Sequence, residues 1–236
     1  MPNCFKILMI ALLSSLTSCS TQKSKHLETW ASSALSPYLI WVHGTQSNPH
    51  HYKIFALSNP DIKTIIYNRY DSSLHWKHQI QKLHQVVSSI PKGHKIIIAG
   101  HSYGGTLTVA YALTYPEKIS EIIVIAAPLQ RILRPYWHTP FIKLHPYVPN
   151  SPLHQVLYEN KQLESLWGYI EALKRPLSIR VHGFFDNNDL RVNPKNINFL
   201  KGLSLEISLF KTQNLGHLPH FKKTALLRDL LGFPAL

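Results

Sequence analysis

The stretch that decides the fold of this chain is IIIAGHSYGG, residues 96–105. It begins as an apolar run of strand length and ends in a Gly-x-Ser-x-Gly pentapeptide, after which residues 106–115 follow a helical pattern. A serine between strand and helix must lie on a strained turn, and Gly100 and Gly104 are small enough to let the two elements approach. Such a turn presents the serine Oγ at the carboxyl end of the strand. We therefore predict that Ser102 is a nucleophile rather than a helix cap in a glycine-rich turn.

Apolar runs that read as strands alternate with helical patterns over most of the chain. Between two of these runs, the apolar residues from Trp76 to Ile90 recur at helical spacing, and Pro91 and Gly93 end that helix. Alternation of this kind predicts a mostly parallel central sheet with helices on both faces. Besides the run before Ser102, the expected strands are residues 38–42, 62–67, 119–126, 177–183 and 203–210.

Short motifs also follow the expected strands on either side of Ser102. The run from Tyr38 to Thr45 ends in His-Gly-Thr, the run 177–183 ends in His-Gly, and Gly216-His217 follows the last expected strand. In this order the chain resembles the α/β-hydrolase family, on its lipase and esterase side, whose members have an oxyanion loop, a serine, an acid and a histidine in sequence. The resemblance implies an α/β-hydrolase fold over residues 37–236.

The resemblance leaves two candidates for the acid that would orient the catalytic histidine. Asp186 matches the family's Gly-x-x-Asp spacing after Gly183, whereas Asp189 is followed by Leu-Arg-Val and matches its Asp-x-x-Val pattern. We prefer Asp189, because Val192 and the proline that follows place the return of the chain. Asp186 remains the alternative acid, and the aspartate that is not the acid is expected to cap a turn.

The resemblance also implies the remaining catalytic groups. His217 is the expected general base, in preference to His220, because it directly follows a glycine after a strand. The backbone N–H groups of Thr45 and Tyr103 are the expected oxyanion hole, since each follows its motif in the required position. With Ser102, these residues would cleave a carboxylic ester of a lipid or other acyl compound through an acyl-enzyme.

Three other functions remain open at this point. The same residues would serve an acyltransferase or a thioesterase, and a hydrolase-fold lipoprotein that only binds its ligand would need none of them. No cofactor is required for the hydrolytic reaction. We also expect no metal site, because adjacent histidines such as His50 and His51 point apart and no acidic residue or cysteine lies at ligand spacing.

The segment between the strand 119–126 and Pro176 has a different character. Prolines break an aromatic and basic stretch, and the part containing Leu163, Leu166 and Trp167 is periodic like a helix. It falls where α/β-hydrolases carry a cap, so we expect a small lid insertion at about residues 129–175. Its aromatic side chains either pack the insertion onto the core or line an acyl pocket.

The N-terminus reads as a secretion signal. Lys6 precedes a short apolar run, and small residues then lead to Leu16-Thr17-Ser18-Cys19, which resembles a bacterial lipobox. We expect residues 1–18 to be a lipoprotein signal peptide, Cys19 to be lipidated, and residues 19–36 to be a polar tether. The protein would then be a membrane-anchored lipoprotein of the bacterial cell envelope.

The net charge is +13, from 25 lysines and arginines against 12 acidic residues. Such an excess favours anionic partners, but the basic residues are scattered along the chain and no nucleic-acid-reading motif is present. We therefore expect contact with an anionic membrane rather than with nucleic acid, and plain solubility explains the charge equally well. The sequence leaves the oligomeric state open.

Overall fold

The structure is a computed structural model that describes residues 27–30, 36–44, 52–53, 56–57, 60–67, 74–130, 152–189 and 192–212. The signal peptide, Cys19, Thr45 and His217 fall outside these ranges, and so does the first part of the expected lid insertion, residues 131–151.

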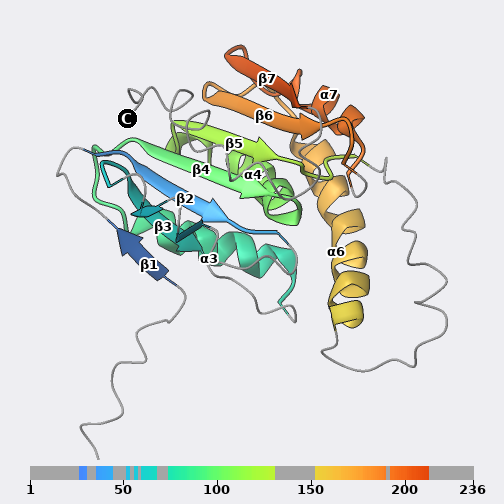
Figure 1. Ribbon diagram of the computed structural model, residues 1–236, viewed down its shortest axis with the longest axis horizontal. Coiled ribbons are helices and arrows are strands. Elements are labelled where there is room, and N and C mark those ends of the chain that lie inside the picture. Colours follow the sequence, from blue (N-terminus) through green and yellow to red (C-terminus); the bar gives the residue numbers. More distant parts are fainter. Residues whose placement is uncertain are drawn as a thin grey trace, which may run out of the picture.

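A seven-stranded sheet organises the described part of the chain (Figure 1). Its order is β1-β3-β2-β4-β5-β6-β7, in which β1 runs antiparallel to β3 and the other neighbours are parallel. The mostly parallel sheet expected from the alternating pattern is thereby confirmed. The strands are β1 (Leu27–Trp30), β2 (Tyr38–Val42), β3 (Lys63–Tyr67), β4 (Ile96–His101), β5 (Glu121–Ile125), β6 (Arg180–Asp186) and β7 (Ile207–Thr212).

The first strand changes the expected boundary between tether and domain. β1 lies inside residues 19–36, for which we expected a polar tether, and it pairs with β3 through four residue pairs. The sheet therefore begins before residue 37. Four residues rich in polar groups give little strand signal by themselves, because the pairing with β3 selects the extended conformation.

In the described part of the chain, three long helices share one core with one face of the sheet, and Figure 1 shows α4 between α3 and α6. They are α3 (Trp76–Ser88), α4 (Tyr103–Thr114) and α6 (Pro152–Leu173). The helix predicted from Trp76 onward is confirmed as α3, which buries one apolar side and exposes the other. α4 is buried nearly all round because it packs against the sheet and both neighbouring helices. Short turns complete the described helices: η1 (Pro116–Lys118), η2 (Pro194–Asn196) and α7 (Ile197–Leu200).

Both faces of the sheet are buried. Alternate residues such as Ile98 and Val124 join the helices in one core, and their neighbours such as Trp41 and Ile123 form a second core on the opposite face with Tyr52. A parallel sheet needs this double cover, and it explains why its strands read as continuous apolar runs. In the second half of the expected lid, α6 contributes Trp167 to the first core, where the side chain is 5% exposed.

Two strands begin three or more residues later than the ranges read in the sequence. The strand expected at 177–183 runs from Arg180 to Asp186, and the last strand begins at Ile207 rather than at residue 203. Leu177 forms only an isolated bridge with Ser204. The pairing of β6 with β5 and β7 sets its bounds, and the ladder continues through Phe184 and Phe185, which no alternating pattern marks.

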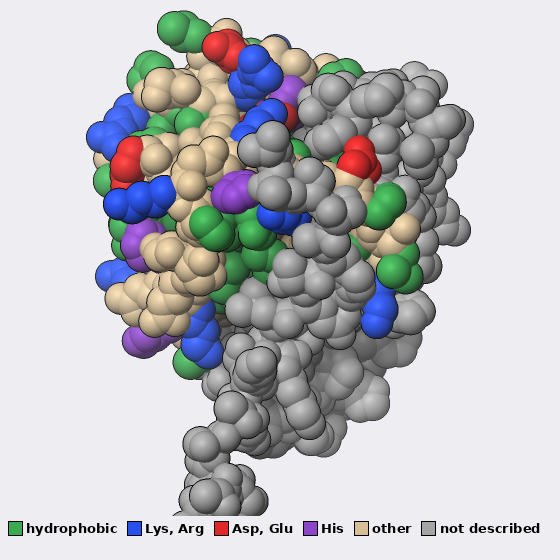
Figure 2. All heavy atoms as spheres, turned by 90° about the vertical axis from the view of Figure 1, so that its left-hand side faces the viewer, with side chains coloured by type: hydrophobic (Ala, Val, Ile, Leu, Met, Phe, Trp, Pro, Cys, Tyr) green, Lys and Arg blue, Asp and Glu red, His purple; other side chains and the backbone are tan. Residues whose placement is uncertain are grey.

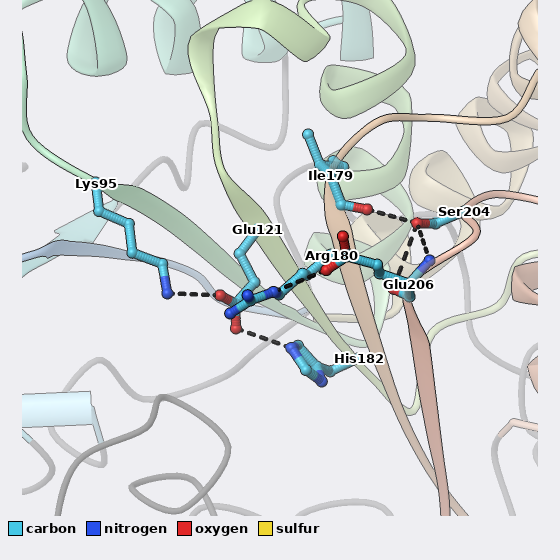
Figure 3. Close-up of polar contacts among 7 residues, drawn as sticks. All are labelled: Lys95, Glu121, Ile179, Arg180, His182, Ser204 and Glu206. Carbon is cyan, nitrogen blue, oxygen red and sulfur yellow. Dashed lines mark hydrogen bonds and ion pairs between the residues drawn. The ribbon is translucent and has the colours of Figure 1, made fainter.

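At the amino ends of the strands, a charged row crosses three neighbours (Figure 3). Glu121 of β5 is fully buried, and its carboxylate lies 2.8 Å from Lys95 Nζ on one side and 2.8 Å from His182 Nε2 on the other. Burial by itself raises the pKa of Glu121, but the hydrogen bonds and charges of His182 and Lys95 outweigh burial and hold that pKa below its usual value.

This row makes a testable contribution to stability. Glu121→Gln leaves Lys95 without its carboxylate partner and alters the contact with His182, and we expect it to lower the free energy of unfolding at pH 7 by about 2–3 kcal/mol. Because the folded-state pKa is depressed, the contribution is present above the ordinary carboxyl pKa of about 4.3 and is lost as the pH falls below it. Urea unfolding at pH 7 and at pH 3 measures both effects.

The exposed pair of Arg180 and Glu206 supplies the control. Their side chains are 60% and 69% exposed and lie 2.9 Å apart, so Glu206→Gln is expected to change stability little at either pH. A Glu121→Gln variant whose loss equals that of Glu206→Gln, or persists unchanged at pH 3, contradicts the assignment.

The side of the molecule from which β2, β4 and β5 begin carries lysine and arginine side chains among polar and apolar ones, and Figure 2 shows them spread rather than gathered in one patch. In the part of the chain that the structure describes, no helix has the length and apolar character needed to cross a membrane.

Candidate active site

Ser102 lies on the sharp turn between β4 and α4, as the sequence predicted. Its backbone has φ 54° and ψ −129°, a left-handed region that L-residues other than glycine rarely enter. The Ser102 N–H donates to Ile125 O of the neighbouring strand at 2.9 Å, and Ser102 O accepts from the Gly105 N–H at 2.9 Å. The residue is therefore held in a strained conformation from both sides, which is the geometry of a nucleophile elbow.

Close packing around this turn depends on glycine. A Cβ on Gly104 would collide with the carbonyl oxygens of Val42 and His43 at the end of β2. A Cβ on Gly100 would likewise collide with Thr108 Oγ1, which donates to Gly104 O at 2.9 Å. Both flanking glycines of the pentapeptide thus allow helix, turn and sheet to touch through their backbones.

Replacing one of these glycines tests the packing directly. Gly104→Ala must push the start of α4 away from the end of β2, and we expect it to lower the free energy of unfolding by about 3 kcal/mol. Gly168→Ala is the matched control, because a Cβ there meets nothing within 4 Å and alanine favours the interior of α6 by about 0.5–1 kcal/mol. Urea denaturation compares the two variants, and equal effects would refute the close approach.

The loop after β2 lies against the nucleophile turn. A Cβ added to Gly44 would stand 2.7 Å from Ser102 Cβ, so the backbone that leads into Thr45 passes directly beside the serine. Tyr103, the other expected oxyanion donor, is the first residue of α4, and the N–H groups in the first turn of a helix point out of its N-terminus, which favours negative charge nearby. Thr45 itself lies outside the described residues, so the pair of donors stays a prediction.

Two histidines near the turn are buried. His43 is 0% and His101 1% exposed, and His43 Nδ1 lies 3.0 Å from Gly44 O. A Cβ on Gly44 would also stand 3.1 Å from His101 Nδ1, so both histidines lie in the closely packed region beside Ser102.

Both candidate acids are buried at the carboxyl end of β6. Asp186 is the last residue of the strand and Asp189 lies in the turn that follows, each with 1% exposure. Asp186 Oδ1 accepts from the Asn188 N–H at 2.7 Å, and Asp189 Oδ1 accepts from the Val192 N–H at 3.0 Å. Each carboxylate therefore accepts a hydrogen bond that closes a turn. Because both aspartates do so, turn capping does not show which of them is the acid that would orient His217.

The parallel sheet brings the serine and both aspartates to one edge. His101 pairs with Ile125, which pairs with Phe184, so Ser102 and Asp186 follow paired positions on β4 and β6. Two strand spacings of about 4.8 Å separate these strands, which leaves room for one imidazole between hydroxyl and carboxylate. His217 follows the end of β7 by five residues, a reach of up to about 17 Å from a strand that ends level with Asp186.

Two features beside the site carried no sequence signal. Ala126, directly after β5, has φ 45°, although no glycine marks the position. Asn196 is completely buried and binds two backbone amides near residue 130. Among the described residues, no three histidine, cysteine or acidic side chains are grouped as a metal site requires.

Comparison with known proteins gives partial matches in sequence and broad ones in structure. The family model described as alpha/beta hydrolase fold matches residues 80–156, which contain Ser102. A proline iminopeptidase of Saccharolobus solfataricus is 31% identical over 98 residues, and this match covers 36% of the chain and 32% of the relative. The chain thus spans about a third of the length of that curated relative.

Similarity in structure extends over most of the chain. A metagenome-derived lipolytic enzyme superposes with a TM-score of 0.66 and 16% identity, covering 89% of this chain and 97% of the other. The monoacylglycerol lipase of Paleococcus ferrophilus gives a TM-score of 0.65 and 13% identity, covering 87% and 97%. At these identities the likeness establishes the shared fold.

Proposed function

The chain is an α/β-hydrolase by fold, and on that premise we propose that it is a serine hydrolase that cleaves carboxylic esters through an acyl-enzyme. One observation carries the proposal: Ser102 is held at positive φ between β4 and α4, with the backbone at Gly44 packed against it. Strain of this kind at a buried strand end is characteristic of catalytic turns, and a structural serine has no need of it.

The proposed reaction uses the residues expected from the sequence. Ser102 Oγ attacks the ester carbonyl carbon while its proton passes to His217, and the N–H groups of Tyr103 and Thr45 bind the oxyanion. The alcohol leaves with the proton from the imidazolium, and the acyl group remains on Ser102. Water then attacks with His217 as base, which releases the carboxylic acid and restores the serine. Asp189, or Asp186 in its place, fixes the imidazole and stabilises its charged form.

Two considerations favour esters as substrates. The structural relatives named above are lipolytic, and the insertion between β5 and β6 is rich in aromatic and aliphatic residues, as walls for an acyl chain would be. A peptide substrate is the alternative that the iminopeptidase match favours, although that match covers only a third of the relative.

The test combines a mechanism-based probe with a set of substrates. We expect a fluorophosphonate to label the wild-type protein, and p-nitrophenyl esters from acetate to palmitate to be hydrolysed, with prolyl p-nitroanilide left intact. Labelling without turnover of any ester, but with cleavage of the prolyl amide, would replace the ester proposal by a peptidase. A protein that neither labels nor turns over any of these compounds would be a binding protein with this fold.

We also propose that the enzyme is held at a membrane of the bacterial envelope by lipid on Cys19, as the lipobox-like sequence suggests. Wild-type protein expressed in bacteria is then expected to incorporate radiolabelled palmitate and to partition into detergent, whereas Cys19→Ser does neither. Cys4→Ser is the matched control, because that cysteine lies within the expected signal peptide.

A basic protein can also bind an anionic membrane through its charge alone, without a lipid anchor. High salt distinguishes these two causes of membrane binding. Salt at 1 M shortens the Debye length to about 3 Å and releases a protein held by surface charge, but it leaves buried acyl chains in place. Release of the wild type by salt alone, without palmitate incorporation, would contradict the lipid anchor.

A further inference from the structure

The segment that leaves β5, residues 126–130, is held by side chains from other elements. Pro128 O accepts a hydrogen bond from Thr106 Oγ1 of α4 at 3.0 Å and another from Trp167 Nε1 of α6 at 2.7 Å. Thr106 and Trp167 are both buried. One carbonyl oxygen therefore joins this segment to the helix that follows the nucleophile and to the helix of the insertion.

Asn196 holds the next two residues of the segment. Its Oδ1 accepts from the Leu129 N–H and from the Gln130 N–H, both at 2.7 Å, and its Nδ2 donates to Asn193 O at 2.9 Å. These partners fix the orientation of the amide, because only its oxygen accepts and only its nitrogen donates. Asn196 is 0% exposed, so water cannot replace the two bonds to the segment.

Asn196 is also the last residue of η2, seven residues after Asp189 in the chain. Asp189 Oδ1 accepts from the Val192 N–H, and Asn193 Oδ1 accepts from the Lys195 N–H, each at 3.0 Å. Hydrogen bonds between side chain and backbone thus join Asp189 to Val192, and Asn193 to both Lys195 and Asn196. Fixing Asn196 therefore restrains Asn193, which directly follows the Val192 bound by Asp189.

The segment held by Asn196 borders the nucleophile. Ile125 O accepts from the Ser102 N–H at 2.9 Å, and the Ala126 N–H donates to Phe184 O of β6 at 2.8 Å. A Cβ on Gly105 would stand 2.7 Å from Ala127 Cβ, so the start of α4 and this segment are in close contact. Through the segment, both β6, which ends at Asp186, and the residues that follow Asp189 as far as Asn196 are connected to the backbone beside Ser102.

We propose that Asn196 is a positioning residue for the reaction: its two amide bonds hold the acid-bearing turn in register with the segment beside Ser102. This inference rests on the proposed serine hydrolase. Loss of the two bonds leaves the fold in place but lets the aspartates move relative to the serine. Displacements of about 1 Å in such constellations lower rates by up to about 10²-fold, and we expect kcat rather than KM to carry the loss.

Two asparagines of the same turn provide a matched pair of variants. Asn196→Ala removes both bonds to residues 129 and 130, whereas Asn193→Ala removes only the cap on the Lys195 N–H. We expect Asn196→Ala to lower kcat on p-nitrophenyl butyrate about 10- to 100-fold with KM unchanged, well below its melting temperature, and Asn193→Ala to keep kcat within about threefold.

Hydrogen exchange supplies a readout independent of the substrate. The amides of Leu129 and Gln130 should exchange at least about tenfold faster in Asn196→Ala than in the wild type, and at the wild-type rate in Asn193→Ala. Where Asn196→Ala does not fold, Asn196→Gln takes its place, since the extra methylene displaces the acceptor from both amides.

The outcomes separate the inference from the proposed function. Wild-type protein that is not labelled by a fluorophosphonate contradicts the proposed function itself. Wild-type protein that is labelled, with kcat of Asn196→Ala unchanged or lowered as much as that of Asn193→Ala, overturns the positioning role of Asn196. Faster exchange at residues 129 and 130 without loss of kcat overturns it as well, because the two bonds would then serve stability alone.

Discussion

Ser102→Ala is expected to lower ester turnover by roughly 10⁶-fold and to abolish labelling by a fluorophosphonate. The reason is that Oγ is the atom that bonds to the acyl group, and no other group of the proposed site can take its place. Alanine occupies the same strained backbone at Ser102, so the fold should remain, with a circular dichroism spectrum and urea midpoint close to those of the wild type. Initial rates on p-nitrophenyl butyrate and gel fluorescence measure the two losses.

Ser88→Ala serves as the control for this variant. Ser88 is exposed on α3, where its Oγ lies 3.4 Å from His84 Nε2, and its replacement should leave labelling and turnover at wild-type levels. Labelling that persists in Ser102→Ala would show that another residue is the nucleophile, and the assignment of the elbow as the catalytic turn would be wrong.

The second large effect concerns the acid. Asp189→Asn should lower kcat by about 10³–10⁴-fold, because an amide can no longer hold the imidazole of His217 in the required tautomer or stabilise its positive charge. Asp186→Asn should cost far less. The two variants are well matched, since an asparagine Oδ1 can still accept from the Val192 N–H or from the Asn188 N–H and so keep each turn closed.

The relative losses of kcat in Asp189→Asn and Asp186→Asn decide which aspartate is the acid. Rates should be measured with urea midpoints for both proteins, so that a loss of stability is not counted as a loss of catalysis. If Asp186→Asn has the larger effect on kcat, Asp186 is the acid and the rest of the proposed reaction stands. If neither variant loses more than about tenfold, the triad itself is contradicted.

How much of the molecule the sequence predicts depends on how local each signal is. Ten consecutive residues predict the turn at Ser102, because the strand, the glycines and the helix adjoin one another in the sequence. The structure confirms this turn. The parallel sheet also follows from the chain, since each buried strand is an unbroken apolar run. The sequence predicts that β6 ends at residue 183, three residues before its observed end at Asp186. Pairing with β5 and β7 sets that boundary, and the residues of β6 alone do not.

Features that depend on residues far apart in the chain could not be predicted from the sequence. Asn196 binds amides 66 and 67 residues away, and an asparagine two residues after a proline is typical of an ordinary turn. Ala126 has positive φ and donates its N–H to Phe184 O of β6, and alanine, unlike glycine, does not mark such a position in the sequence. The row of Lys95, Glu121 and His182 is likewise assembled only when three strands pair.

The edge strand β1 limits how far the catalytic domain can stand from a membrane. If lipid is attached to Cys19, eight residue steps lead to Leu27, where the chain is already paired with β3. Even fully extended, these steps span at most about 29 Å, less than the thickness of the hydrocarbon core of a bilayer. Leu27 would then lie within about 29 Å of the lipid attached to Cys19, so that an ester in the same membrane would be met by lateral diffusion instead of by collision from solution.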